Sequence, residues 1–196
     1  MPTTIFDISM SLDGYITGPH QTADGPLGKG GEALHEWSMD QDPAGRQELT
    51  AAVERYGAVI TGRTTYDHSL PSWGVDGPTG GARRPVVVIT HQAPEDSPDN
   101  GVYEFVTEGI EAALGRATAV AGNGCVCVMG GANVGQQFIQ AGMVDEISLH
   151  IAPVLFGDGK RLFDRLEAKA IRLEPIHVAE SRMATHVRYR VLGIAF

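Results

Sequence analysis

The chain has 196 residues, 42% of them hydrophobic, and a formal net charge of −9 at pH 7. Its length and ordinary composition favour one folded domain, residues 1–196. Its excess of acidic residues argues against nucleic acid or a membrane surface as a general partner, because proteins bind these mainly through Lys and Arg. No apolar run approaches the ~20 residues of a membrane span and residues 1–4 do not resemble a signal peptide, so we expect a cytoplasmic protein.

The order of apolar runs, glycines and prolines predicts strands and helices that alternate along the chain. The strands are expected at 3–11, 58–62, 85–90, 102–106, 125–128 and 144–154, followed by a hairpin of 171–181 with 185–196. The helices are expected at 32–39, 42–56 (closed by Gly57), 63 onward, 108–121 and 134–141. Loops are expected at 71–84 and at 17–31, which is long enough to act as a lid.

This order predicts an α/β fold with three layers, in which a mixed, mostly parallel sheet carries helices on both faces and ends in an antiparallel hairpin at its edge. Cys125 and Cys127 lie two positions apart in an expected strand, where they would face the same side in poor geometry for a disulfide. We interpret both as small buried hydrophobic residues.

Two stretches run from an apolar strand into glycine and then into a helix. One passes from residue 125 through Gly130-Gly131, and the other passes from residue 58 through Gly62 into Arg63-Thr64-Thr65. A helix N-terminus offers unpaired N–H groups and partial positive charge, and glycine lets a ligand approach the backbone, so both are candidate phosphate sites. The alternatives are a tight turn at the glycines and a threonine helix cap beside a surface arginine.

Two acids are candidates for moving a proton. Asp13 follows the first strand beside the suspected lid, although Asp-Gly is also the commonest turn dipeptide. Glu36 lies beside Trp37 on a partly apolar helix, and a solvated helix face is its alternative. The seven histidines show no metal-binding spacing, so we expect no protein-bound metal.

Several of these motifs together resemble the dihydrofolate reductase superfamily, and in particular the C-terminal reductase domain of the riboflavin-biosynthesis protein RibD. The matching segments span nearly the whole chain in the family's order and are Ser11 to Ile16, Ile60 to Tyr66, Val88 to His91, Val128 to Ala132, Gly142 to Glu146 and Ile151 to Gly159. The resemblance implies a dihydrofolate reductase-like fold and an NADPH-dependent reductase.

The resemblance also assigns cofactor-binding positions. It implies that Gly62, Arg63, Thr64 and Thr65 hold the pyrophosphate region, that Gly130, Gly131, Ala132, Asn133 and Val134 line the rest of the cofactor, and that the backbone from Ile16 to Gly18 covers the nicotinamide. Thr90-His91 falls where dihydrofolate reductases usually carry Ser-Arg for the 2′-phosphate. Histidine binds anions more weakly than arginine and only when it is protonated, so the cofactor could be NADH instead of NADPH.

The first hypothesis is therefore a reductase that passes hydride from NADPH to a C=N or C=O carbon of a small heterocyclic or sugar-derived substrate, with Asp13 or Glu36 relaying the proton. Its activity could be like that of 5-amino-6-(5-phosphoribosylamino)uracil reductase or, on a pteridine, like that of dihydrofolate reductase. The second hypothesis is a non-catalytic nucleotide-binding module that works as a homodimer through its C-terminal edge strand. A flavin in place of the nicotinamide is a third.

Overall fold

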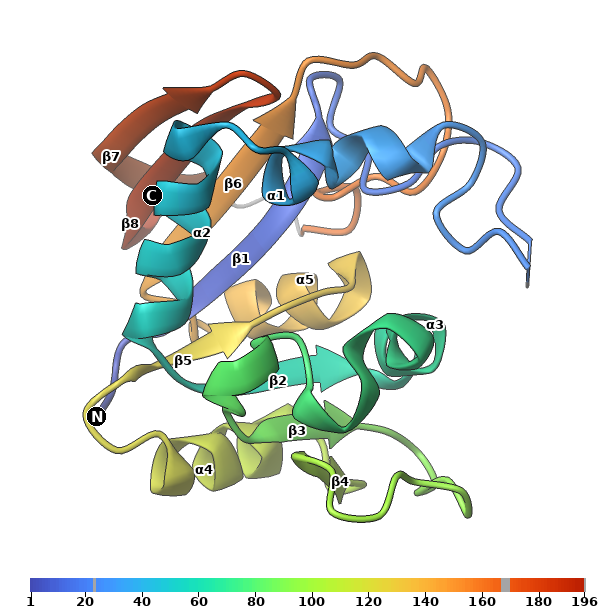
Figure 1. The fold of residues 1–196 in the computed structure, drawn as a ribbon. Coiled ribbons are helices and arrows are strands. Elements are labelled where there is room, and N and C mark those ends of the chain that lie inside the picture. The colour runs from blue at the N-terminus through green and yellow to red at the C-terminus, as the bar shows by residue number, and fades with distance from the viewer. Residues whose placement is uncertain (23, 167–169, 196) are drawn as a thin grey trace.

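The computed structural model describes residues 1–196 with the exception of 23, 167–169 and 196 (Figure 1). The strands are β1 (Thr4–Ser11), β2 (Tyr56–Gly62), β3 (Val86–Ile89), β4 (Tyr103–Val106), β5 (Cys125–Val128), β6 (Glu146–Ala152), β7 (Ala170–Ser181) and β8 (Ala184–Ala195). The α-helices are α1 (Glu36–Met39), α2 (Pro43–Arg55), α3 (Arg63–Trp73), α4 (Ile110–Val120) and α5 (Ala132–Gln140). Short 3-10 helices lie at Gly31–Leu34, Gly74–Asp76 and Gly80–Ala82.

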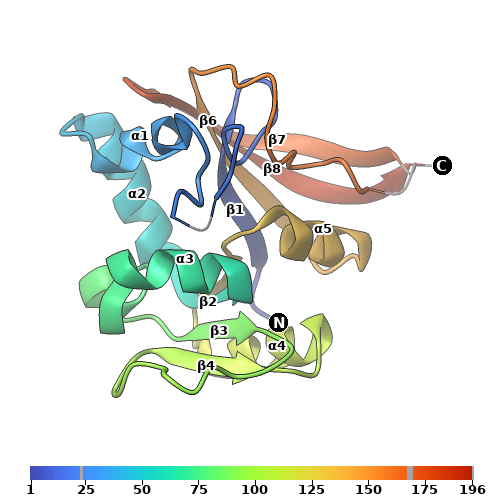
Figure 2. The ribbon, with the colours of Figure 1, turned by 90° about the vertical axis from the view of Figure 1, so that its right-hand side faces the viewer.

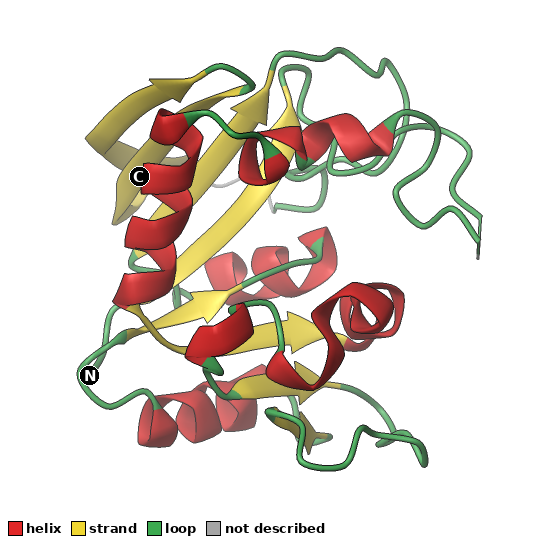
Figure 3. Cartoon of the chain, viewed as in Figure 1, coloured by secondary structure: helices red, strands yellow, loops and turns green. Residues whose placement is uncertain are grey.

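The strands form an 8-stranded sheet in the order β4-β3-β2-β5-β1-β6-β8-β7. The first six strands in this order pair in parallel, and β8 and β7 pair antiparallel at the end of the sheet (Figure 3). The mixed, mostly parallel sheet with its terminal hairpin confirms the fold class expected from the sequence. The carboxyl ends of β1, β2 and β5 consequently meet at one edge, which is where parallel sheets place ligands.

Helices cover both faces of this sheet (Figure 2). On one face α4 and α5 enclose a core built around Phe6, Val128 and Phe138, each fully buried. On the other face, α2 and α3 cover a second core that contains Val59, Tyr66 and the free thiols of the two cysteines. The prediction that Cys125 and Cys127 are buried hydrophobic residues is confirmed.

Three element boundaries differ from the sequence predictions. The expected helix at 32–39 is broken at His35 into a 3-10 turn and α1. The helix begun at Arg63 continues through Pro71 to Trp73, where a loop was expected, because a proline in the last turn removes little of the helical hydrogen bonding. Gly57 lies inside β2 rather than closing α2, and an added Cβ there would come within 2.0 Å of the Ala121 carbonyl oxygen.

Within the described part of the chain, no helix is both long and apolar enough to cross a membrane.

Candidate functional site

Two helices begin side by side at the carboxyl edge of the sheet. Gly62 ends β2 and precedes α3, and Gly131 follows β5 and precedes α5, so each helix starts directly from a buried strand. Neither start has a side-chain cap, which leaves the first amide groups of both helices without helical partners. Backbone donors and the positive ends of two helix dipoles therefore face the same region.

The ends of β2 and β5 are bonded together at this point. The Thr61 hydroxyl donates to the Met129 carbonyl oxygen at 2.9 Å, and the Gly62 amide donates to the Gly130 carbonyl oxygen at 3.3 Å. A Cβ added at either Gly130 or Gly131 would lie 3.4 Å from the Thr65 hydroxyl of α3. The two glycines therefore keep side-chain atoms out of the region between the helix starts, so a ligand can approach the backbone there.

Arg63 connects this pair of helix starts to the turn after β3. Its guanidinium donates to the Asp67 carboxylate at 2.7 Å and to the Gln92 carbonyl oxygen at 2.9 Å. Thr90 is buried and donates to the same carbonyl oxygen at 2.7 Å, whereas the neighbouring His91 is exposed. The guanidinium therefore lies beside the turn at 90–92, with its charge balanced by Asp67.

A cleft of about 1140 Å³ runs from these helix starts to the floor beneath α1 and α2. Eleven of the positions that the sequence assigned to the cofactor line it: Ile16, Gly62, Arg63, Thr64, Thr65, Thr90, His91, Gly130, Gly131, Asn133 and Val134. Gly18, Ala132 and both candidate acids lie outside its lining. The structure thus brings most of the predicted binding positions together and leaves the predicted acids apart from them.

Asp13 holds a turn in place instead of facing the cleft. Its carboxylate accepts hydrogen bonds from the Ser11 hydroxyl at 2.6 Å and from the amides of Phe156 and Gly157 at 3.1 and 2.7 Å. Partial desolvation opposes ionisation, but these hydrogen bonds outweigh it and lower the pKa of Asp13 below its ordinary value. A carboxylate held as an anion by three donors is poorly suited to deliver a proton.

We therefore expect Asp13→Asn to weaken folding more than chemistry. Loss of the charged acceptor should lower the free energy of unfolding at neutral pH by about 1 kcal/mol, because the site is partly exposed. Since the folded pKa is lowered, this contribution is present above the ordinary carboxyl pKa of 3.8 and disappears as the pH falls through the folded value. Urea unfolding at neutral and acidic pH measures it, with Asp158→Asn in the same turn as the control. Unchanged stability with lost turnover would contradict this role.

Glu36 is exposed on the first turn of α1, which agrees with the alternative interpretation of a solvated helix face. Trp37 on the same helix is buried. The Trp37 indole donates to the Ser9 hydroxyl at 2.9 Å, and its ring stacks on the His150 ring with centroids 4.1 Å apart. Trp37 thereby covers the floor of the cleft, where β1 and β6 present polar side chains.

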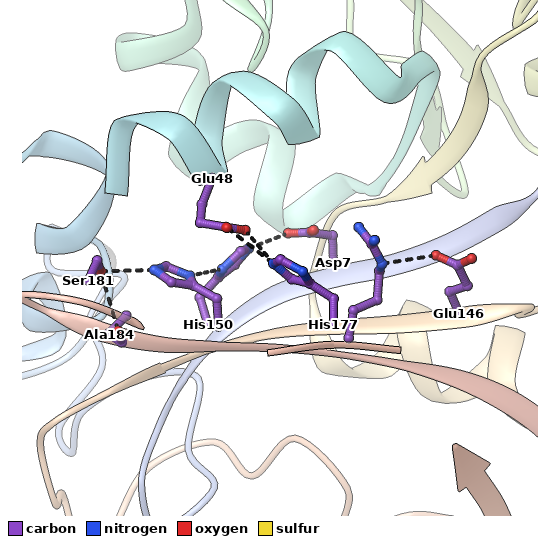
Figure 4. A network of polar contacts seen from close by, with 9 residues as sticks. Asp7, Glu48, Glu146, His150, His177, Ser181 and Ala184 are labelled. Atoms are coloured by element: carbon purple, nitrogen blue, oxygen red, sulfur yellow. Dashed lines mark hydrogen bonds and ion pairs between the residues drawn. The ribbon is translucent and has the colours of Figure 1, made fainter. Parts of the chain in front are cut away.

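This floor contains a polar network that the sequence patterns did not reveal (Figure 4). His150 Nε2 lies 3.1 Å from the Asp7 carboxylate, and His150 Nδ1 lies 2.7 Å from His186 Nδ1. His186 Nε2 lies in turn 2.8 Å from the Ser181 hydroxyl. Asp7 and His150 line the cleft, and their side chains are only 12% and 6% exposed.

Burial and charge act together on the network. Burial disfavours the Asp7 carboxylate, but attraction to His150 and the hydrogen bond from it outweigh this, and the pKa of Asp7 is lowered. Burial, followed by the proximity of His150, lowers the pKa of His186 to about 4, so the His186 ring is neutral near pH 7. The same two causes lower the pKa of His35, which also lines the cleft. The signal available in the sequence was the occurrence of Asp7, Ser9 and His150 within otherwise apolar strands.

A family model described as the RibD C-terminal domain matches residues 2–187. The chain belongs to the RibD C-terminal domain family. The chain is also 26% identical over 163 residues to the uncharacterized protein YwjB of Bacillus subtilis (strain 168), with 83% of each chain covered.

Solved structures share the fold of this chain. A protein of Shewanella sp. PV-4 assigned to riboflavin biosynthesis matches with a TM-score of 0.70 and 24% identity, over 97% of this chain and 99% of that one. The Thermotoga maritima diaminohydroxyphosphoribosylaminopyrimidine deaminase/5-amino-6-(5-phosphoribosylamino)uracil reductase matches with a TM-score of 0.62 and 16% identity, over 97% of this chain and 56% of that one. These likenesses confirm the predicted fold.

Proposed function

We propose that this chain is a nicotinamide-dependent reductase that transfers hydride to the carbon of a C=N or C=O group in a small heterocyclic or sugar-derived substrate. The observation that carries the proposal is the single cleft, which joins two uncapped helix starts to a floor of aromatic and titratable side chains. The helix starts suit the pyrophosphate of a dinucleotide, and the floor suits a planar ring.

The binding positions follow from this arrangement. The first amides of α3 and α5 and the Thr65 hydroxyl would hold the pyrophosphate, in the space that Gly130 and Gly131 leave open. Arg63 lies beside the turn at 90–92 and is paired with Asp67; a ribose phosphate would replace that carboxylate as its partner, which favours NADPH over NADH. The bound nicotinamide would supply the hydride, and the protein would position it against a substrate beneath α1 and α2.

The substrate class is the next part of the proposal. The cleft is lined by aromatic side chains that include Trp73 and Trp37, the latter stacked on the His150 ring, and such a lining suits a pyrimidine-like or pteridine-like ring. Lys160 lines the same cleft, and its ammonium group could bind a phosphate carried by the substrate. We therefore rank a 5-amino-6-(5-phosphoribosylamino)uracil-like compound, the substrate in the Thermotoga protein's name, ahead of a dihydropteridine.

Direct titration with NADPH and with NADH tests the proposal. Trp37 and Trp73 both line the cleft, so we expect quenching of tryptophan fluorescence that saturates with NADPH at lower concentration than with NADH. Oxidation of the bound NADPH is then measured with pyrimidine and pteridine substrates. Absence of any response to either nucleotide would contradict the proposal. Saturable binding without oxidation of NADPH by any substrate would favour the second hypothesis, a nucleotide-binding homodimer, and a yellow purified protein would indicate a flavin.

A further inference from the structure

The histidine between the first 3-10 helix and α1 has a backbone that is fixed from both sides. The His35 amide donates to the Glu32 carbonyl oxygen at 2.9 Å. The His35 carbonyl oxygen accepts hydrogen bonds from the Ser38 amide at 3.1 Å and from the Ser38 hydroxyl at 2.8 Å. The 3-10 helix ends at Leu34 and α1 begins at Glu36, so the break between them falls on this residue. The break therefore limits the directions in which the His35 side chain can point.

The His35 imidazole, in contrast to its backbone, has no protein partner. Within the part of the chain that the structure describes, it takes part in no hydrogen bond or ion pair, although His35 is half-buried and lines the cleft. Its nitrogens are also absent from the fully buried polar atoms without a partner in that part of the chain, so they reach the water in the cleft. Both ring nitrogens of His150, by comparison, already have partners in Asp7 and His186.

His35 lies at the end of the cleft that the cofactor would leave to the substrate. The 3-10 helix before it contacts β1 and β6, and α1 contacts α2, whereas α3 and α5 begin at the ends of β2 and β5 (Figure 1). Leu49 and Val53 of α2 line the same end, as does Trp37, two positions after His35. A flat ligand on these apolar side chains would have the free imidazole at its edge.

The protonation state of His35 determines what its ring can do. Burial, followed by the proximity of His150, lowers the pKa of His35 below its ordinary value of 6.5, so the ring is neutral near pH 7. A neutral imidazole carries one N–H donor. A carbonyl oxygen or imine nitrogen accepts such a hydrogen bond, and hydride addition to the neighbouring carbon places negative charge on that atom. The hydrogen bond therefore strengthens in the transition state, which is the condition for it to accelerate the reaction.

We propose that His35 is a catalytic residue that donates a hydrogen bond to the oxygen or nitrogen of the substrate's C=O or C=N group. This rests on the proposed function. The substrate carbon gains the hydride that the dihydronicotinamide gives up on becoming the oxidised nicotinamide, the C=O or C=N double bond becomes a single bond, and the heteroatom takes up a proton from water. His35 polarises the double bond and stabilises the developing charge, and its own protonation is the same before and after the step.

A binding experiment tests this hydrogen bond without any reaction. Uridine 5′-monophosphate carries a planar ring with two carbonyl groups, and ribose 5-phosphate lacks the ring. His35→Phe keeps a flat side chain but removes the donor, so it should weaken binding of uridine 5′-monophosphate by about tenfold and leave binding of ribose 5-phosphate within about twofold of wild type. Titration calorimetry measures both. Equal affinity of wild type and His35→Phe for uridine 5′-monophosphate, or no binding of it to wild type, would overturn the proposal.

His177→Phe is the matched control for this substitution. His177 bonds to Glu48 at 3.1 Å and lies outside the cleft lining, so its replacement should leave the affinity for both probes within about twofold of wild type. A loss in this control equal to that of His35→Phe would show that the effect is not specific to the cleft, and would contradict the proposal.

The kinetic test has a readout that a purely structural role would not give. His35→Phe should lower the single-turnover rate of NADPH oxidation by about 100-fold, as expected for loss of one donor to a developing negative charge, while NADPH affinity stays within about threefold. His35→Gln keeps an N–H donor and should recover about tenfold of that loss. Wild-type turnover in His35→Phe, or equal turnover in the two folded variants, would contradict the assignment. If His35→Phe does not fold, His35→Leu replaces it in both experiments.

The two experiments separate this proposal from the proposed function. If uridine 5′-monophosphate binding depends on His35 but NADPH neither binds nor is oxidised, only the proposed function fails. If NADPH is oxidised while neither the probe affinity nor the turnover depends on His35, the proposed function stands and the role of His35 is wrong.

Discussion

Thr65→Glu is expected to abolish most NADPH binding while leaving the fold intact. Thr65 is the third residue of α3, and its hydroxyl lies 3.4 Å from the Cβ position of Gly130 and of Gly131, across the space assigned to the pyrophosphate. A glutamate at this helical position is compatible with the helix dipole, so stability should be unchanged or slightly raised. Its carboxylate would nevertheless face the phosphates, and repulsion between like charges should lower NADPH affinity by about 100-fold, equivalent to ~2.7 kcal/mol.

The variant Thr65→Gln distinguishes the effect of the added charge on NADPH affinity from the effect of the larger side chain. The glutamine has the size of glutamate without its charge, so we expect an affinity loss of only about tenfold, from crowding alone. Fluorescence titration measures both variants, and because exposed charges are screened by salt, the gap between them should narrow as the ionic strength rises. Equal affinity of Thr65→Glu and wild type would show that the pyrophosphate does not bind between the two helix starts.

Gly135→Ala is expected to have the largest effect on stability. Gly135 is a buried residue of α5, and an added Cβ would lie 2.1 to 2.7 Å from three ring atoms of Phe6 on β1. Phe6 is fully buried in the sheet core, so neither the ring nor the helix can yield without loss of packing. Overpacking of this kind costs about 3 kcal/mol, which for a chain of this length corresponds to a drop of roughly 6–12 °C in melting temperature.

Gly115→Ala provides the matched control in the neighbouring helix α4. Its Cβ would have no atom within 4 Å, and alanine is the better helix former, so this variant should gain about 0.5–1 kcal/mol. Urea and thermal unfolding measure both variants. A Gly135→Ala protein as stable as wild type would show that α5 does not lie as close to β1 as described, and the position of the α5 start at the cleft would have to be revised.

The sequence predicted the part of the site that is local along the chain. Gly62 and Gly131 each combine a strand end, a turn and a helix start within a few residues, so short-range periodicity was enough to place them. The same reasoning could not assign a role to Asp13, because the local sequence of a turn aspartate is the same as that of a catalytic one. Its hydrogen bonds from the amides of residues 156 and 157 become known only with the structure. The extension of α3 through Pro71 was missed because proline is read as a helix breaker.

The histidine network depends on strand pairing, which no local pattern encodes. Asp7 and His150 are 143 residues apart in sequence, and they meet because β1 and β6 pair in parallel. His186 comes opposite His150 through the antiparallel register of β8 with β6. The polar residues within these strands were visible in the sequence, but their shared face became known only with the register.

The central position of β1 has a consequence for how the protein is made. This strand is synthesised before both of its partners in the sheet, which are β5 at residues 125–128 and β6 at 146–152. The apolar segment around Ile5 and Phe6 therefore stays unpaired until residues 125–128 of its first partner have been synthesised, and unpaired strands of this kind are prone to aggregation and to chaperone binding. Because Asp7 lies on that strand, the floor of the cleft is among the last parts of the molecule to assemble during translation.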